Sequence, residues 1–128
     1  MNEKYKMVTG RKQDLLLRTK AFALRIVRLY SALPKTTEAQ VIGKQVLRSG
    51  TSVGAHVREG KRSRTDAELI SKPEGALQEL EETVYWLELL SEAGIVRTEL
   101  LTDLMKEAHE LTAIFVAGVK TVKQRRAK

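Results

Sequence analysis

The chain contains no cysteine, and no part of it approaches the length of apolar sequence that a membrane-spanning helix requires. Without cysteine, disulfides and thiolate metal sites are excluded, which fits a reducing compartment. A spanning helix needs about 18 or more consecutive apolar residues. The N-terminal residues 1–6 also lack the apolar core of a signal peptide. We therefore expect a cytoplasmic protein that does not enter a membrane.

The sequence is also poor in residues that interrupt helices, with only two prolines and eight glycines. It shows no strand-like alternation of useful length and no internal repeat. Aromatic residues make up 5% of the chain, and most lie on expected helix faces rather than among basic residues. A stacking platform for single-stranded bases, which needs aromatic side chains beside cations, is therefore not expected.

The size and charge of the chain suit one globular domain, residues 1–128, with polyanionic partners. The sequence is 42% apolar and 30% charged, and its formal net charge is +7. Basic residues dominate residues 1–28, 44–72 and 111–128, whereas residues 74–110 hold ten acidic and two basic residues. Such blocks predict complementary faces, either within one molecule or between subunits.

Apolar residues recur at helical spacing in four segments. We expect helices at about residues 12–33, 37–59, 65–93 and 98–123, followed by a fraying basic tail at 120–128. Short links between amphipathic helices make an all-α, antiparallel up-down-up-down four-helix bundle the expected fold.

Glycines mark the second segment. Gly43, Gly50 and Gly54 lie inside it, where each costs about 1 kcal/mol relative to alanine. They predict a close approach of another helix, the alternative being that this segment is not one helix. Thr36 and Thr37 are candidate N-caps, and Gly60 is expected just past the helix end.

Pro73 leaves two possibilities open for the third segment. Thr65–Glu68 has the spacing of a capping box, and so has Ser71–Glu74. Either the helix starts near Thr65 and kinks at Pro73, or residues 65–71 form a separate turn and the main helix starts near Ser71.

The residues that would carry catalysis or bind a metal are scarce. His56 and His109 are the only histidines, and they do not have metal-ligand spacing. We expect both on the surface or in an interface. The glycine-containing stretch 54–62 departs from a phosphate-binding loop in spacing and lacks its Ser or Thr. We therefore expect neither enzymatic activity nor a metal or other cofactor.

Two groups of cations are candidates for binding nucleic-acid phosphates, the alternative being a charge pattern that only aids solubility. The first lies around the expected turn between the second and third helices, and the second closes the chain. They are Arg58, Lys61, Arg62 and Arg64, and then Lys120, Lys123, Arg125, Arg126 and Lys128.

Two charged stripes repeat every seven residues, and they could pair between helices or remain solvated. One runs along the first helix and the other along the third. They are Arg11, Arg18 and Arg25, and then Glu74, Glu81 and Glu88.

The sequence resembles the four helix bundle protein family, also called the 23S ribosomal RNA intervening-sequence protein family. The resemblance runs from about residue 14 to 118. It rests on FALRIVRLY at 22–30, Leu33-Pro34, IGKQVLRSGTSVGA at 42–55, Glu59, and YWLELL at 85–90. Its most specific part is the Arg-Ser-x-x-Ser-Val stretch at 48–53. The chain departs from the family at His56, where Asn is usual, and at Pro73, where an apolar residue is common.

This resemblance implies a ring-shaped homopentamer and an association with nucleic acid, RNA ahead of DNA, rather than a reaction. The similar fold of the accessory protein of diversity-generating retroelements implies a reverse transcriptase as a protein partner. A protein-interaction scaffold that binds no nucleic acid remains the alternative.

The second expected helix also carries a compact polar flank beside its apolar face. The flank comprises Gln45, Arg48, Ser52, Ala55 and Glu59. It suits an interface with a neighbouring subunit, the alternative being that Arg48 pairs within its own chain.

Overall fold

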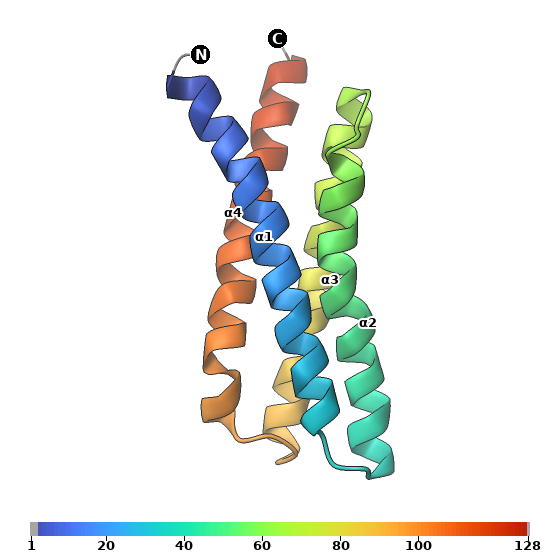
Figure 1. Cartoon of the computed structure of the whole chain (residues 1–128). Coiled ribbons are helices and arrows are strands. Elements are labelled where there is room, and N and C mark those ends of the chain that lie inside the picture. Colours follow the sequence, from blue (N-terminus) through green and yellow to red (C-terminus); the bar gives the residue numbers. More distant parts are fainter. Residues whose placement is uncertain (1–2, 128) are drawn as a thin grey trace.

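The structure, a computed structural model, describes the backbone of residues 3–127 and the side chains of residues 15–127. Its four helices are α1 (Glu3–Ala32), α2 (Thr37–Gly60), α3 (Asp66–Glu92) and α4 (Thr98–Ala127). They run alternately up and down, and each packs against the next along the chain (Figure 1). The expected all-α up-down four-helix bundle is confirmed.

The close helix approach predicted from the glycines of α2 is the contact between α1 and α2. A Cβ atom added to Gly43 would lie 2.5 Å from Leu33 Cδ1, and one added to Gly50 would lie 2.8 Å from Ile26 Cγ1. At Gly54 the nearest atom would be Thr19 Oγ1, at 3.3 Å. The glycines therefore let α1 lie on the backbone of α2, which offsets their poor helix propensity.

The core lies along the bundle axis and is almost entirely aliphatic. Its largest fully buried side chains come from all four helices and include Phe22, Ile26, Val46, Val53, Leu80, Leu87, Leu90 and Leu111. Between α2 and α3 the buried Thr83 hydroxyl donates to Ser49 Oγ at 2.8 Å. This bond gives both buried hydroxyl groups a partner inside the core.

The helix caps follow the expected signals with one exception. Thr36 caps α2, and Thr65 caps α3 by accepting a hydrogen bond from the Glu68 N–H. Gly94 ends the turn after α3 with a φ of 72°, a conformation that favours glycine. Gly60 was expected just past α2, but it is the last residue of that helix, and Lys61 is the C-cap in a right-handed conformation.

Three helix boundaries differ from the sequence expectation. The first helix begins at Glu3 rather than near Lys12, and the fourth continues to Ala127 rather than fraying after 123. The third starts at Asp66 and contains Pro73, so a main helix starting near Ser71 is wrong. The lengthened ends are rich in Lys, Arg, Glu and Gln, which favour helix even without an apolar stripe.

Candidate nucleic-acid interface

One end of the bundle gathers segments that are far apart in the sequence. Because the helices alternate in direction, the turn between α2 and α3 lies at the same end as the start of α1 and the end of α4 (Figure 1). The connections α1–α2 and α3–α4 lie at the opposite end. We call the first end, defined by residues 56–75 and 116–127, the basic end.

The turn at the basic end is short and held by local hydrogen bonds. The Arg62 and Ser63 amides donate to the Glu59 and Gly60 carbonyls, at 3.1 and 3.0 Å. On the α3 side, the Arg64 N–H donates to Glu68 Oε2 at 2.8 Å, which completes the predicted capping box one residue earlier than expected. The backbone of the turn is thereby fixed while its basic side chains remain exposed.

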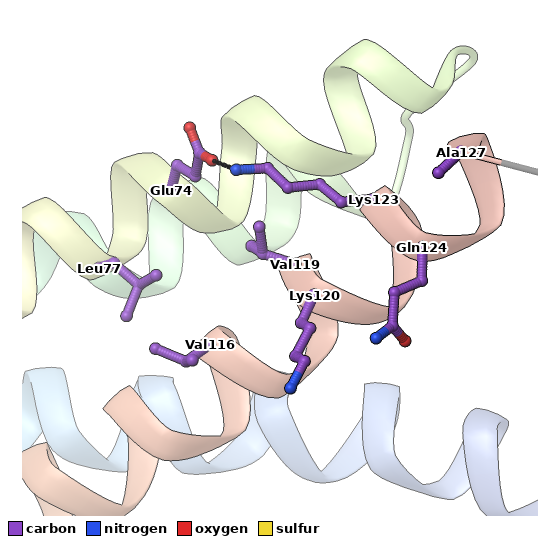
Figure 2. A pocket seen from close by; sticks show the side chains of 8 residues that line it. All are labelled: Glu74, Leu77, Val116, Val119, Lys120, Lys123, Gln124 and Ala127. Atoms are coloured by element: carbon purple, nitrogen blue, oxygen red, sulfur yellow. Dashed lines mark ion pairs between the residues drawn. The ribbon is translucent and has the colours of Figure 1, made fainter.

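The cations at the end of α4 reach across to α3. Lys123 Nζ lies 2.9 Å from Glu74 Oε1 (Figure 2), and Arg125 Nη2 lies 2.9 Å from Asp66 Oδ1. Asp66 directly follows the turn. The Arg125–Asp66 pair therefore connects the end of α4, which carries the second predicted cation group, to the turn that carries the first. Neither acid stood out as a site residue, because nothing local in the sequence indicates which carboxylate a remote cation will reach.

Six of the nine candidate cations are exposed and form no ion pair with any residue whose side chain the structure describes. They are Arg58, Lys61, Arg62, Arg64, Lys120 and Arg126. In Figure 2, Lys120 points away from Glu74, whereas its neighbour Lys123 pairs with it. Lys128 lies outside the described residues. The basic end therefore presents cationic groups that are open to solvent.

The polar flank of α2 faces α3 of the same chain. Arg48 Nη2 donates to Glu82 Oε2 at 2.7 Å, and its Nη1 lies 3.6 Å from Glu79 Oε1. The Ser52 hydroxyl donates to the Arg48 carbonyl at 2.7 Å. Of the two possibilities, the structure contains the intrachain pairing of Arg48. A subunit-interface role for Gln45, Arg48, Ser52 and Glu59 stays a prediction.

A second ion pair between these helices lies near the turn. Lys72 Nζ donates to Glu59 Oε2 at 2.9 Å. This hydrogen bond, reinforced by Coulomb attraction, lowers the pKa of Glu59 and raises the pKa of Lys72. Both groups are therefore charged at neutral pH, and Lys72 is occupied rather than available to an anion.

The two heptad stripes do not pair with each other among the residues that the structure describes. Arg18 binds α4 instead, where its Nε donates to Glu107 Oε2 and its Nη2 to Glu110 Oε2, both at 3.1 Å. Glu74 pairs with Lys123 of α4. The side chain of Arg11 lies outside the described residues. The arginine stripe thus helps attach α1 to α4, which otherwise approach each other over little of their length.

The histidines lie in different surroundings. His109 is exposed on α4, as expected. His56 is half-buried between α2 and α3, where a Cβ on Gly75 would lie 2.7 Å from its ring. Its Nδ1 is buried and has no hydrogen-bond partner among the described residues.

The sequence predicts neither a metal centre nor a membrane-spanning helix. The residues that the structure describes include no group of three or more acidic or histidine side chains that could hold a metal ion. None of the helices formed by these residues is both long and apolar enough to cross a membrane.

The chain is a small α-helical protein, a four-helix bundle with an exposed cationic end. The family model of the 23S rRNA-intervening sequence proteins matches residues 11–117, and the chain belongs to this family. It is also similar to the crystal structure of a protein of unknown function from the S23 ribosomal protein family of Bacteroides thetaiotaomicron. The identity is 36% and the TM-score 0.78, over 83% of this chain and 98% of that one. A search of curated proteins found no match.

Proposed function

We propose that this protein is a non-enzymatic, homo-oligomeric module that binds nucleic acid through the phosphate backbone, with RNA as the preferred ligand. The observation that supports this most directly is the meeting of two remote cation groups at one end of the bundle, tied by Arg125 and Asp66. Convergent Lys and Arg side chains bind phosphates and release counterions, which makes such binding strong at low salt.

The chemistry of the basic end favours contacts with the backbone rather than with bases. Residues 56–75 and 116–127 contain no Phe, Tyr or Trp, and the one histidine there, His56, is half-buried between α2 and α3. The basic end therefore offers no large exposed ring on which bases could stack. Lys and Arg at a turn and a helix end reach phosphates without reading base edges. We therefore expect little sequence preference, and we place RNA first because of the family's association with ribosomal RNA intervening sequences.

The oligomer we propose is the ring-shaped homopentamer that the family resemblance implies. Repeating the basic end around a ring multiplies the attraction for a polyanion. An accessory role in a retroelement or a ribosomal RNA intervening sequence follows from the same resemblance. The first protein partner to test is a reverse transcriptase.

Fluorescence anisotropy with labelled RNA and DNA, at about 50 and 200 mM salt, tests the proposal. The test variant is Lys61→Gln/Arg62→Gln at the basic end. The matched control is Lys35→Gln/Lys44→Gln, which removes the same charge nearer the opposite end.

We expect the test variant to bind more weakly. Its slope of log affinity against log salt should fall by about 0.7–0.9 for each phosphate that the variant no longer neutralises. The control should retain affinity and slope. Equal effects of the two variants would mean that total charge, not the basic end, governs binding. If the unaltered protein binds neither RNA nor DNA at about 50 mM salt, the nucleic-acid function is wrong, and the protein-interaction scaffold replaces it.

A further inference from the structure

The outward face of α3 is acidic along its whole middle section. Glu81, Glu88 and Glu92 are exposed there and form no ion pair with the side chains that the structure describes. Tyr85 lies between them with 53% of its surface exposed. The sequence contains no Lys or Arg between Pro73 and Arg97, so nothing on this part of the helix neutralises the face.

The outward face of α1 has the complementary character. Leu17 and Leu24 follow each other at heptad spacing with exposures of 71% and 46%, beside Val27 at 41%. Lys20 and Arg28 flank this apolar row, are exposed, and form no ion pair within the described part of the chain. An apolar row flanked by cations on an outer helix face favours burial against an apolar surface flanked by acids.

The matching groups lie at similar heights along the bundle. Ile26 of α1 packs at Gly50 of α2, and the adjacent Ser49 bonds to Thr83 of α3. These contacts place Ile26 and Thr83 at about the same level.

Counted along the helices from that level, each α1 group lies nearer the basic end than its α3 counterpart, by a similar distance in all three pairs. At 1.5 Å per residue the offset is roughly one helical turn. The matched pairs are Lys20 with Glu81, Leu24 with Tyr85, and Arg28 with Glu88. Because α1 and α3 run in the same direction (Figure 1), one uniform shift aligns all three pairs between two parallel copies.

An apolar groove adjoins the acidic face and could receive the leucine row. It runs between α3 and α4, where Leu77 and the half-exposed Val116 line it near the basic end (Figure 2). A second hollow between the same two helices lies farther along, and Leu101 and Met105 line it. Its α3 side carries acidic residues that include Glu88.

We propose that the outward face of α1 of one copy packs against the acidic face of α3, and the groove beside it, of a second copy. This inference rests on the homo-oligomer of the proposed function and names its contacting surfaces. Each copy then contacts one neighbour through its α1 face and another neighbour through its α3 face, so the contact is head-to-tail. Repetition of a head-to-tail contact closes into a ring when the rotation allows it and each bundle tilts enough from the ring axis to absorb the one-turn shift. With the copies parallel, all the basic ends lie on one side of the assembly.

Charge reversal in the full chain tests this contact by light scattering coupled to size exclusion. One variant is Lys20→Glu/Arg28→Glu on α1, and another is Glu81→Lys/Glu88→Lys on α3. We expect each to reduce the particle to the mass of one chain, 14.4 kDa. The four-substitution variant that carries both reversals has the net charge of the unaltered protein and should regain its mass.

The matched control is Lys35→Glu/Lys44→Glu, which changes the net charge as the α1 variant does and should keep the oligomer. Circular dichroism checks that each variant has full helix content. An unaltered protein of 14.4 kDa would overturn both the oligomer and this contact. An oligomer that persists in both two-site variants, or that the four-site variant fails to restore, would overturn the contact while leaving the proposed oligomer in place.

Discussion

Gly50 lies where α2 passes closest to the buried Ile26 of α1. The Cβ of an alanine there would lie within 2.8 Å of Ile26 Cγ1 and 3.0 Å of Cγ2. We expect Gly50→Ala to lower the free energy of unfolding by about 1–3 kcal/mol, because the cost of overpacking exceeds the gain in helix propensity. Urea unfolding at fixed protein concentration measures it.

Gly118 provides the control, because a Cβ there meets nothing within 4 Å. Gly118→Ala should raise the free energy of unfolding by about 0.5–1 kcal/mol through helix propensity alone. If the two substitutions shift stability in the same direction, close packing at Gly50 does not explain its place in α2.

Glu107 makes the stability of the bundle depend on pH. The hydrogen bond from Arg18 lowers the pKa of Glu107 below its ordinary value of 4.5. A lowered pKa in the folded state adds stability that is complete above pH 4.5 and is lost as the pH falls through the folded value.

We therefore expect Glu107→Gln to cost about 1 kcal/mol at neutral pH, and the difference from the unaltered protein to shrink below pH 4.5. Thermal unfolding between neutral and acidic pH measures this. Glu99→Gln is the control, since Glu99 is 78% exposed and 4.0 Å from Arg97. A difference that stays constant with pH would contradict the role of the Arg18 contact.

At the scale of the helix, α3 continues through Pro73. Because proline has no N–H, residue 73 cannot donate the helical hydrogen bond to the Leu69 carbonyl. Pro73→Leu should then raise the free energy of unfolding by about 1–3 kcal/mol, less the unfolded-state restriction that proline provides. Pro34→Ala, in the α1–α2 connection, should instead lower it by about 0.4–1 kcal/mol. Guanidinium unfolding compares the two, and a neutral or destabilising Pro73→Leu would contradict a strained helix.

The existence of the four helices was predictable because their apolar residues repeat at helical spacing. The close approach at Gly43 and Gly50 was also predictable, since interior glycines are costly unless a neighbour needs the space. The direction in which the polar flank of α2 faces was not predictable. A flank beside the apolar stripe can face a helix of its own chain or of another, and one helix's periodicity does not distinguish the two. The contact of Arg48 with Glu82 shows that this residue of the flank pairs with α3 of its own chain, whereas a contact of the flank with a second copy stays a prediction.

At the scale of the whole molecule, the end of α4 contributes both to the stability of the bundle and to the positive charge of the basic end. Ending the chain after Val122 removes the pairs that Lys123 and Arg125 make with α3. We expect the melting temperature to fall by a few degrees, because each exposed pair contributes about 0–1 kcal/mol. The RNA binding that we propose should weaken as well.

Lys120→Gln/Arg126→Gln separates these effects, because neither side chain forms an ion pair with the described residues. This variant should weaken RNA binding in the anisotropy assay and leave the melting temperature unchanged. Should the truncated chain and this variant both bind RNA as the unaltered protein does, the end of α4 takes no part in binding.

The candidate site was predictable only in its parts. Runs of Lys and Arg showed which residues carry charge, such as Arg62 and Arg126. That these groups share one end follows from the alternating direction of the helices. The pairing of Arg125 with Asp66, 59 residues apart, depends on how the packed helices are aligned, which no local pattern encodes.

Because both ends of the described chain emerge beside the cations (Figure 1), the choice of tag matters for anyone who purifies this protein. A polyhistidine, acidic or fluorescent fusion at either terminus would stand next to the surface whose binding is being measured, and it could add or mask affinity. A dye attached through Lys35→Cys, in the connection at the opposite end, would report on binding from a distance. Since the chain has no cysteine of its own, that label would be unique.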